Sequence, residues 1–316
     1  MARSHRLHSM GQRLHETLKN APKRGRPPRR PHGEHRVVGP HVSGEVIVHP
    51  NVRSRHVGGE RDVWVYLPPG YHEAGDRRYP VLYMHDGNNL FDAGAAFGGN
   101  EWHIDETAEW LIHAGELPPL VIVGVANTAE RLDEYTWVRD PDMGGGKGAA
   151  YARFLIDEVR PLVEGHYRVL PGRDNTAVMG SSLGGLVSLY LGAEHGDVFG
   201  RVGAMSPSIW WAERRALADL AGVRTDLRLW LDMGSREGDD ADEWARNLAD
   251  AGELRRLFQS RGYRDGENLL YWEAEHADHS EVAWAGRAAL ALQFLFEEPP
   301  VQDGGWTSWN RPPRPE

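Results

Sequence analysis

The stretch TAVMGSSLGGLVSLYLGAEH, residues 176–195, joins a short apolar run to a helical pattern through a turn rich in glycine and serine. Residues 180–184 match G-x-S-x-G, in which a serine occupies a sharp turn between a strand and a helix. Small residues two positions before and after Ser182 leave room for that turn, and this spacing fails if Ser181 is the reactive residue. The amino end of the helix would direct free N–H groups toward developing negative charge. The stretch therefore predicts a strand, a tight turn and a helix, with Ser182 as a nucleophile.

Short apolar runs and longer helical patterns alternate along the chain. Runs such as Pro80–Met84 are almost continuously apolar, which is typical of strands buried on both faces. The alternation indicates an α/β protein with a mostly parallel central sheet and helices on both faces. In such sheets the chemistry lies at the carboxyl ends of the strands. The expected strands are Val63–Leu67, Pro80–Met84, Leu120–Val125, Thr176–Met179, Val202–Met205, Leu227–Leu231 and Leu269–Trp272, and the expected helices are Ile104–Ala114, Gly148–Glu164, Leu183–His195, Glu243–Arg261 and Ala283–Phe296.

The two ends of the chain differ from its middle in composition. Residues 1–36 hold ten Lys or Arg and two Glu, whereas the whole chain has a net charge of −10, so a basic segment precedes an acidic body. This segment is poor in apolar residues and does not bury enough surface to offset the entropy of ordering. We expect a disordered tail over residues 1–36, one catalytic domain over 37–298 and a proline-rich tail over 299–316.

Composition also excludes several kinds of protein. The absence of cysteine rules out disulfides, thiolate metal sites and a cysteine nucleophile. No apolar run is long enough to cross a membrane, and the first thirty residues lack the apolar core of a secretory signal. We therefore expect a cytoplasmic protein without a membrane partner. The histidines show no H-E-x-x-H or similar helical spacing, so we expect no metal and no cofactor.

A serine hydroxyl is a poor nucleophile without an adjacent base. In sheets that carry this serine turn, the order along the chain is nucleophile, acid and histidine. Two histidines, His276 and His279, follow the last expected strand. His279 is preferred because it stands directly before the final helix, where Ser280 and Glu281 suit the cap. His276 is the alternative base, or simply a polar residue of the loop.

The acid is expected after the preceding strand, where four carboxylates compete: Asp232, Glu237, Asp239 and Asp240. Asp232 falls within the end of the strand, and Asp239 and Asp240 suit the cap of the next helix. Glu237 lies in the loop after Gly234, where its side chain can turn toward the histidine. There it would hold the imidazole in one tautomer and stabilise the imidazolium.

Stabilising an oxyanion requires two N–H donors. The first is expected from the backbone of Leu183, directly after the nucleophile. The second is expected from the loop Asp86–Asn89, which follows the strand at residues 80–84, with the backbone N–H of Asn88 as donor. An ordinary Asp-Gly turn would have the same sequence.

Four separated segments resemble the "Putative esterase" family of α/β hydrolases. They are residues 66–92 (YLPPGYHEAGDRRYPVLYMHDGNNLFD), 179–211 (MGSSLGGLVSLYLGAEHGDVFGRVGAMSPSIWW), 231–238 (LDMGSREG) and 276–296 (HADHSEVAWAGRAALALQFLF). The family includes feruloyl and acetylxylan esterases, enterochelin-type siderophore esterases, S-formylglutathione hydrolase and mycolyltransferases. The resemblance implies an α/β-hydrolase fold without a large lid and a carboxylic ester hydrolase that forms an acyl-enzyme. It also implies Ser182, Glu237 and His279 as the catalytic triad, with Asn88 and Leu183 as oxyanion donors.

The resemblance is nearest to the compact siderophore-type esterases, through Arg131 and the segment Ser206–Trp211. Arg131 suits an anionic or catechol oxygen of a substrate, or else a surface ion pair with Glu134. Trp210 and Trp211 would provide aromatic walls for a planar or sugar-ring substrate, unless they belong to the core. Three further tryptophans are expected near the same face: Trp102, Trp137 and Trp284. We therefore expect a small-molecule or sugar-linked ester as substrate.

Two other functions are compatible with the sequence. The same site would act as an acyltransferase if a sugar or another alcohol replaced water as the acceptor. The segment Pro22–Arg30 resembles an AT-hook, an arm that places Arg-Gly-Arg in the minor groove of A·T-rich DNA. A solvated basic tail accounts for the same residues and is favoured, since the acidic body argues against a nucleic-acid partner.

Overall fold

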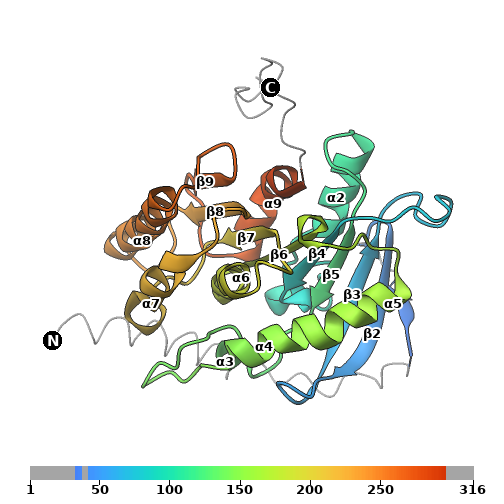
Figure 1. The fold of residues 1–316 in the computed structure, drawn as a ribbon, viewed down its shortest axis with the longest axis horizontal. Coiled ribbons are helices and arrows are strands. Elements are labelled where there is room, and N and C mark those ends of the chain that lie inside the picture. Colours follow the sequence, from blue (N-terminus) through green and yellow to red (C-terminus); the bar gives the residue numbers. More distant parts are fainter. Residues whose placement is uncertain (1–32, 38–41, 297–316) are drawn as a thin grey trace.

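A computed structural model describes residues 33–37 and 42–296. Over these residues the chain forms one open nine-stranded sheet in the order β1-β2-β3-β5-β4-β6-β7-β8-β9 (Figure 1). Strand β1 begins at His35, inside the stretch expected to be a tail. The strands are β1 (His35–Val37), β2 (Glu45–Arg53), β3 (Glu60–Leu67), β4 (Val81–His85), β5 (Val121–Val125), β6 (Thr176–Ser181), β7 (Arg201–Met205), β8 (Arg228–Gly234) and β9 (Leu269–Ala274).

The larger part of the sheet, from β5 through β4 to β9, is parallel. Strands β1, β2 and β3 extend it as antiparallel neighbours, with β3 pairing against β5. This arrangement confirms the expected α/β-hydrolase fold with a mostly parallel sheet. Every residue of β4, β5 and β6 is buried, because helices cover both faces of the sheet at its centre.

The helices form two layers over two apolar cores (Figure 1). Helices α2 and α9 pack together on one face, and the others, except the short α3, contribute to the core on the opposite face. The expected helices are present, and the one at residues 148–164 is built from α4, a π-helical turn (Leu155–Val159) and α5. The helices are α2 (Ile104–His113), α3 (Arg131–Glu134), α4 (Gly148–Phe154), α5 (Arg160–His166), α6 (Leu183–Glu194), α7 (Trp211–Asp219), α8 (Ala241–Ser260) and α9 (Glu281–Phe296).

Some expectations concern residues outside the described ranges. The AT-hook-like segment Pro22–Arg30 and the proline-rich segment 299–316 both lie there. Among the residues that are described, no helix combines the length and apolar character needed to cross a bilayer.

Candidate active site

Ser182 occupies the turn between β6 and α6. Its backbone has φ 59° and ψ −124°, a conformation that side chains with a Cβ rarely adopt. The turn is tight enough that a Cβ on Gly180 would lie 2.8 Å from the carbonyl carbon of Gly184. The Ser182 N–H donates to the Met205 carbonyl at 3.0 Å, so the turn is fastened to the end of β7. Glycine at position 180 is therefore required by the close approach of the backbone in this turn.

Two loops at the same edge of the sheet bring a histidine and a glutamate to this serine. The Nε2 atom of His279, in the loop between β9 and α9, lies 2.9 Å from Ser182 Oγ. Its Nδ1 atom lies 2.7 Å from Oε2 of Glu237, in the loop between β8 and α8. When Nδ1 carries the imidazole proton it donates to Glu237, which leaves Nε2 free to accept from the serine hydroxyl.

The alternatives for base and acid lie elsewhere. The His276 side chain is exposed, and its Nε2 lies 3.4 Å from its neighbour Glu275. Asp232 is buried within β8 and accepts from Arg287 Nε at 3.0 Å. Asp240 caps α8 by accepting from the Glu243 N–H at 2.9 Å.

Glu237 is buried, and its second oxygen is surrounded by donors. Oε1 accepts from the Gly234 N–H at 2.6 Å and from the Ser206 hydroxyl. Ser206 Oγ in turn accepts from Arg287 Nη2 at 2.5 Å and from Trp284 Nε1 at 3.0 Å. A hydroxyl has one donor and two acceptor sites, so all the hydrogen-bonding capacity of Ser206 is used. The orientation of Glu237 toward His279 is thereby fixed by the end of β8, the loop after β7 and helix α9.

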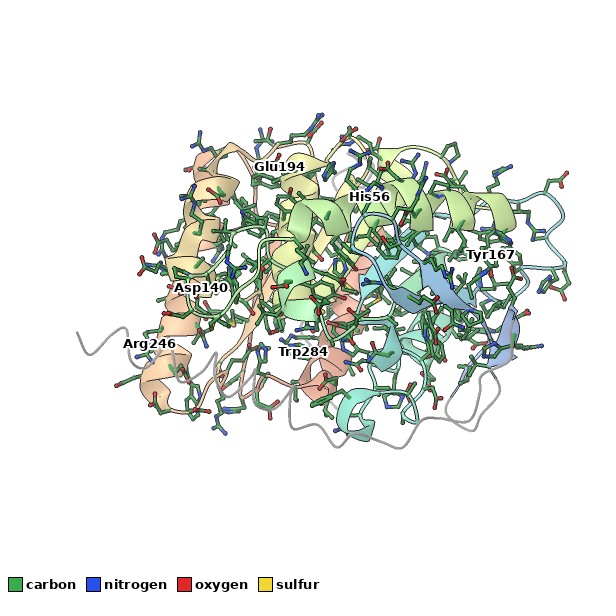
Figure 2. The ribbon with its side chains drawn as sticks, turned by 90° about the horizontal axis from the view of Figure 1, so that it is seen from below. His56, Asp140, Tyr167, Glu194, Arg246 and Trp284 are labelled. Atoms are coloured by element: carbon green, nitrogen blue, oxygen red, sulfur yellow. The ribbon has the colours of Figure 1, made fainter. Side chains whose placement is uncertain are left out.

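Arg287 of α9 serves two buried carboxylates. It lies 3.4 Å from Glu237 Oε1 and 3.0 Å from Asp232 Oδ1. Burial raises the pKa of Asp232, and Arg287 and Trp230 oppose that rise. Trp284, labelled in Figure 2, presents its ring edge-on to His279 with centroids 4.9 Å apart. Arg287 was not predicted from the sequence. It could have been noticed there, because it is the one basic residue of the mostly apolar α9.

The loop after β4 is held by an ion pair. Asp86, with φ 56°, accepts from Nε and Nη2 of Arg131, both at 2.7 Å, and from Asn127 Nδ2 at 2.6 Å. Burial alone would raise the pKa of Asp86, but Arg131 outweighs it and holds that pKa below its usual value. A Cβ on Gly87 would lie 2.3 Å from the backbone of Gly124, so the loop sits directly on β5.

This loop continues into a single 3₁₀ turn, η1 (Gly87–Asn89), which contains Asn88. The side chain of Asn88 accepts from the Asn127 N–H at 3.2 Å and is therefore turned toward the β5 loop. Leu183 is the first residue of α6, where backbone N–H groups have no partner within the helix. Both expected oxyanion donors thus lie in backbone segments held by the surrounding structure.

The family model described as "Putative esterase" matches residues 54–295. The chain belongs to this family. It is 27% identical over 252 residues to the uncharacterized protein YbbA of Bacillus subtilis, covering 77% of this chain and 95% of that protein. It is 29% identical over 167 residues to the iron(III) enterobactin esterase of Dickeya dadantii, covering 53% of this chain and 34% of that one. Among solved structures, the BES protein from Bacillus cereus matches with a TM-score of 0.65 and 22% identity, over 83% of this chain and 97% of that one.

Family membership establishes a carboxylic ester hydrolase, and the expected substrate-binding residues can be placed within this esterase. The expected alternative pair between Arg131 and Glu134 is not formed, because Arg131 binds Asp86 and Glu134 accepts from Arg61 at 2.6 and 2.7 Å. The role of Arg131 toward a substrate stays a prediction, now restricted to the part of its guanidinium that Asp86 leaves free.

The expected aromatic wall is smaller than the sequence indicates. Trp211 is only 3% exposed and its Nε1 donates to the Val138 carbonyl at 2.8 Å, so it belongs to the core and offers little surface to a substrate. Trp102 and Trp284 are also buried, at 3% and 5% exposure. Trp210 is half-buried and packs against Trp211. Of the two tryptophans predicted to bind substrate, Trp210 alone retains a partly open surface.

Proposed function

We propose that this esterase acts through an acyl-enzyme on Ser182, with His279 as the base and Glu237 as the acid of a triad. One observation carries the proposal: a continuous chain of hydrogen bonds runs from Ser182 Oγ through both nitrogens of His279 to buried Glu237. The three residues follow β6, β9 and β8, so the parallel part of the sheet brings them to one edge.

The reaction has two halves. In the first, Ser182 Oγ attacks the ester carbonyl while His279 Nε2 takes its proton, and the backbone N–H groups of Leu183 and Asn88 stabilise the oxyanion. The intermediate collapses, His279 returns the proton to the leaving alcohol, and Ser182 remains acylated. In the second half, water gives a proton to His279 and attacks the acyl group. The intermediate collapses, the acid leaves, and His279 returns its proton to Ser182 Oγ. Glu237 accepts from His279 Nδ1 throughout and stabilises the imidazolium.

The names of two relatives support a proposal for the substrate class. One is an iron(III) enterobactin esterase and the other an endo-1,4-beta-xylanase/feruloyl esterase. We propose a small-molecule or sugar-linked ester of one of these two kinds. The half-buried Trp210 and the Arg131 guanidinium are the residues that would contact it.

A partition experiment tests the acyl-enzyme. Acetate esters of several phenols are hydrolysed in the presence of methanol, and the ratio of methyl acetate to acetate is measured. A common acyl-enzyme predicts one ratio for all leaving groups, because methanol and water compete for the same intermediate. A ratio that changes with the leaving group would indicate direct attack by water and contradict the proposal. The Ser182→Ala variant should form neither product.

A further inference from the structure

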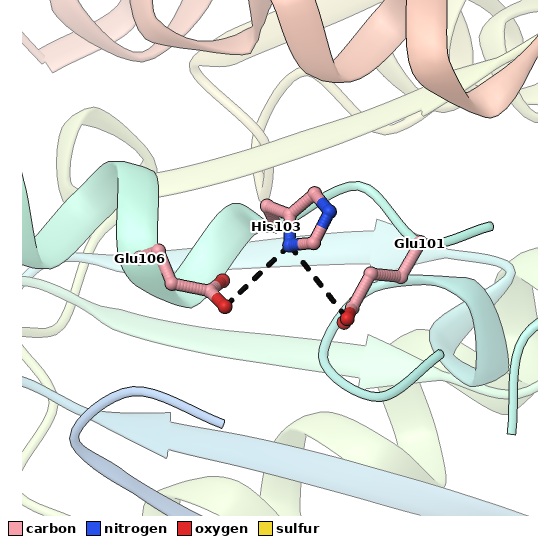
Figure 3. Close-up of side chains that lie close together, drawn as sticks. All are labelled: Glu101, His103 and Glu106. Carbon is pink, nitrogen blue, oxygen red and sulfur yellow. Dashed lines mark hydrogen bonds and ion pairs between the residues drawn. The ribbon is translucent and has the colours of Figure 1, made fainter. Parts of the chain in front are cut away.

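Three side chains meet at the start of α2, away from Ser182: Glu101, His103 and Glu106 (Figure 3). His103 Nδ1 lies 3.6 Å from Glu101 Oε1 and 3.5 Å from Glu106 Oε1. All three potential ligand atoms lie within 4.8 Å of one another. His103 is the residue before the helix and adopts a left-handed conformation, φ 50°, which is uncommon for a residue with a Cβ. In Figure 3 both carboxylates point toward the same imidazole nitrogen.

Glu101 is the unusual member of this cluster. Its side chain is fully buried, at 0% exposure, and neither carboxylate oxygen has a hydrogen-bond partner by geometry. The polar groups that act on Glu101 are His103 and the Ala93 backbone, and neither forms a close hydrogen bond with it. The side chains of Asp105 and Glu106 bond to each other. Buried carboxylates are normally paired with a cation or bound to a metal, and His103 is the one group of this cluster that can carry positive charge.

Although the histidine spacing in the sequence predicts no metal, we propose that Glu101, His103 and Glu106 bind a Zn²⁺ ion. Zinc binds histidine nitrogen and carboxylate oxygen at about 2.0–2.2 Å, which places the ligand atoms of a tetrahedral site roughly 3.4 Å apart. The two measured separations, 3.5 and 3.6 Å, are close to that value. An imidazole among the ligands favours zinc over Mg²⁺ or Ca²⁺, which prefer oxygen. His103 is half-exposed, at 54% of its side chain, so the ion can enter and water can take the fourth position.

The proposed ion would act on structure. Trp102 lies in the sequence between two of the proposed ligands, Glu101 and His103. Its N–H donates to the Asn89 carbonyl at 2.9 Å, which connects the site to the loop expected to hold the oxyanion. Trp102 also packs against Trp284, with ring centroids 5.9 Å apart, and Trp284 contacts His279. Bound zinc would therefore anchor the segment that supports one wall of the active site without touching the reacting atoms.

Calorimetric titration of the chelator-treated full chain with Zn²⁺ tests the proposal. Three variants are compared with the unmodified chain: His103→Asn, Glu106→Gln and His72→Asn. Asparagine tolerates the left-handed conformation of position 103, so that variant removes the ligand without adding strain. His72 is a matched control, because its Nε2 lies 2.7 Å from Glu45 Oε2 with no third ligand in that group.

The unmodified chain and His72→Asn should bind one ion by a saturable high-affinity step and show a higher Tm with zinc. His103→Asn and Glu106→Gln should lose affinity by more than about 100-fold, since loss of an outer-shell partner alone costs about 10–100-fold. The absence of such a step in the unmodified chain would overturn the proposal. Equal affinity in all four proteins would also overturn it, because zinc would then bind elsewhere.

Discussion

Two pairs of buried carboxylates in this esterase are treated in opposite ways. Glu237 and Asp232, at 1% and 0% exposure, are served by Arg287 and by donors from neighbouring loops. Glu101 and Asp105, at 2% and 0% exposure, have His103 and Glu106 as neighbours instead of an arginine. Burying a carboxylate costs free energy in both places. Where hydrogen-bond donors offset that cost, they also hold the carboxylate in one orientation, as a catalytic acid requires. Where they do not, the site favours a proton or a metal ion.

The largest effect is expected at Ser182, the nucleophile that Glu237 supports through His279. Ser182→Ala should lower kcat by about 10⁶-fold, because the remaining groups have no nucleophile to activate. Ser181→Ala is the matched control and should retain most activity, since Ser181 lies within β6 and its neighbour occupies the turn. Both are measured with a chromogenic ester, and unchanged circular dichroism establishes folding. Substantial turnover by Ser182→Ala would refute the assignment of the nucleophile.

The second effect concerns the acid. Glu237→Gln should lower kcat by about 10⁴-fold, because the amide does not stabilise the imidazolium as a carboxylate does. Asp240→Asn should stay near the unmodified enzyme, since asparagine also caps a helix, and Asp239→Asn should do the same. Turnover is compared at about pH 8, where a histidine of ordinary pKa is neutral. A larger drop for Asp239→Asn would move the acid by two residues and leave the rest of the mechanism intact.

A third variant would leave Asp232 and Glu237 without an arginine, as Glu101 and Asp105 are. Arg287→Met leaves Asp232 and Glu237 buried without their cation, which should lower the free energy of unfolding by about 3–5 kcal/mol. Arg160→Met, which removes a surface pair with Glu164, should cost under about 1 kcal/mol. Both are measured by urea denaturation.

The Arg287→Met loss should also depend on pH. Burial already raises the pKa of Asp232, and removal of the arginine would raise it further. A carboxyl group whose pKa is raised in the folded state stabilises the fold most below its unfolded pKa, about 4, and that contribution is lost as pH rises through the folded pKa. The destabilisation should therefore be smaller at about pH 5 than at about pH 8. A loss that grows toward acid pH would contradict this account of the pair.

The smallest effect has the opposite sign. In chelator, Glu101→Gln should raise the free energy of unfolding by about 1 kcal/mol, because it removes a buried charge whose cationic neighbour, His103, lies 3.6 Å away without a close hydrogen bond. Glu116→Gln is the control, since Glu116 is exposed and its carboxylate accepts from Gln293 Nε2 at 3.0 Å. Thermal denaturation of the chelated proteins measures both. A lower Tm for Glu101→Gln without metal would show that the carboxylate is already satisfied.

The sheet and the loops that carry the site could be predicted from the sequence. Buried parallel strands appear as continuous apolar runs, and their order along the chain decides which loops share an edge. That reasoning, together with the family resemblance, led to Ser182, Glu237 and His279, and the structure brings His279 within hydrogen-bonding distance of both others. Strand β2 was missed because its polar residues and proline hide the alternation of a strand with one open face.

The surroundings of the site could not be predicted in the same way. Arg287 and Ser206 are 81 positions apart and meet only because α9 packs beside the end of β7. Trp211 is followed by a turn in which Ala212, Glu213 and Arg214 all have positive φ. The residue types in this turn do not predict that conformation. The position of Glu101 beside His103 likewise depends on the left-handed conformation of the histidine. Such contacts are decided by tertiary packing, which local patterns do not encode.

The most direct test of the central claim is covalent labelling. The full chain is treated with a fluorophosphonate, digested, and its peptides are mapped by mass spectrometry while residual esterase activity is followed. The account predicts one adduct, on Ser182, appearing in step with the loss of activity, and no adduct in Ser182→Ala. Labelling of Ser181, or full inactivation with the adduct on another residue, would contradict it.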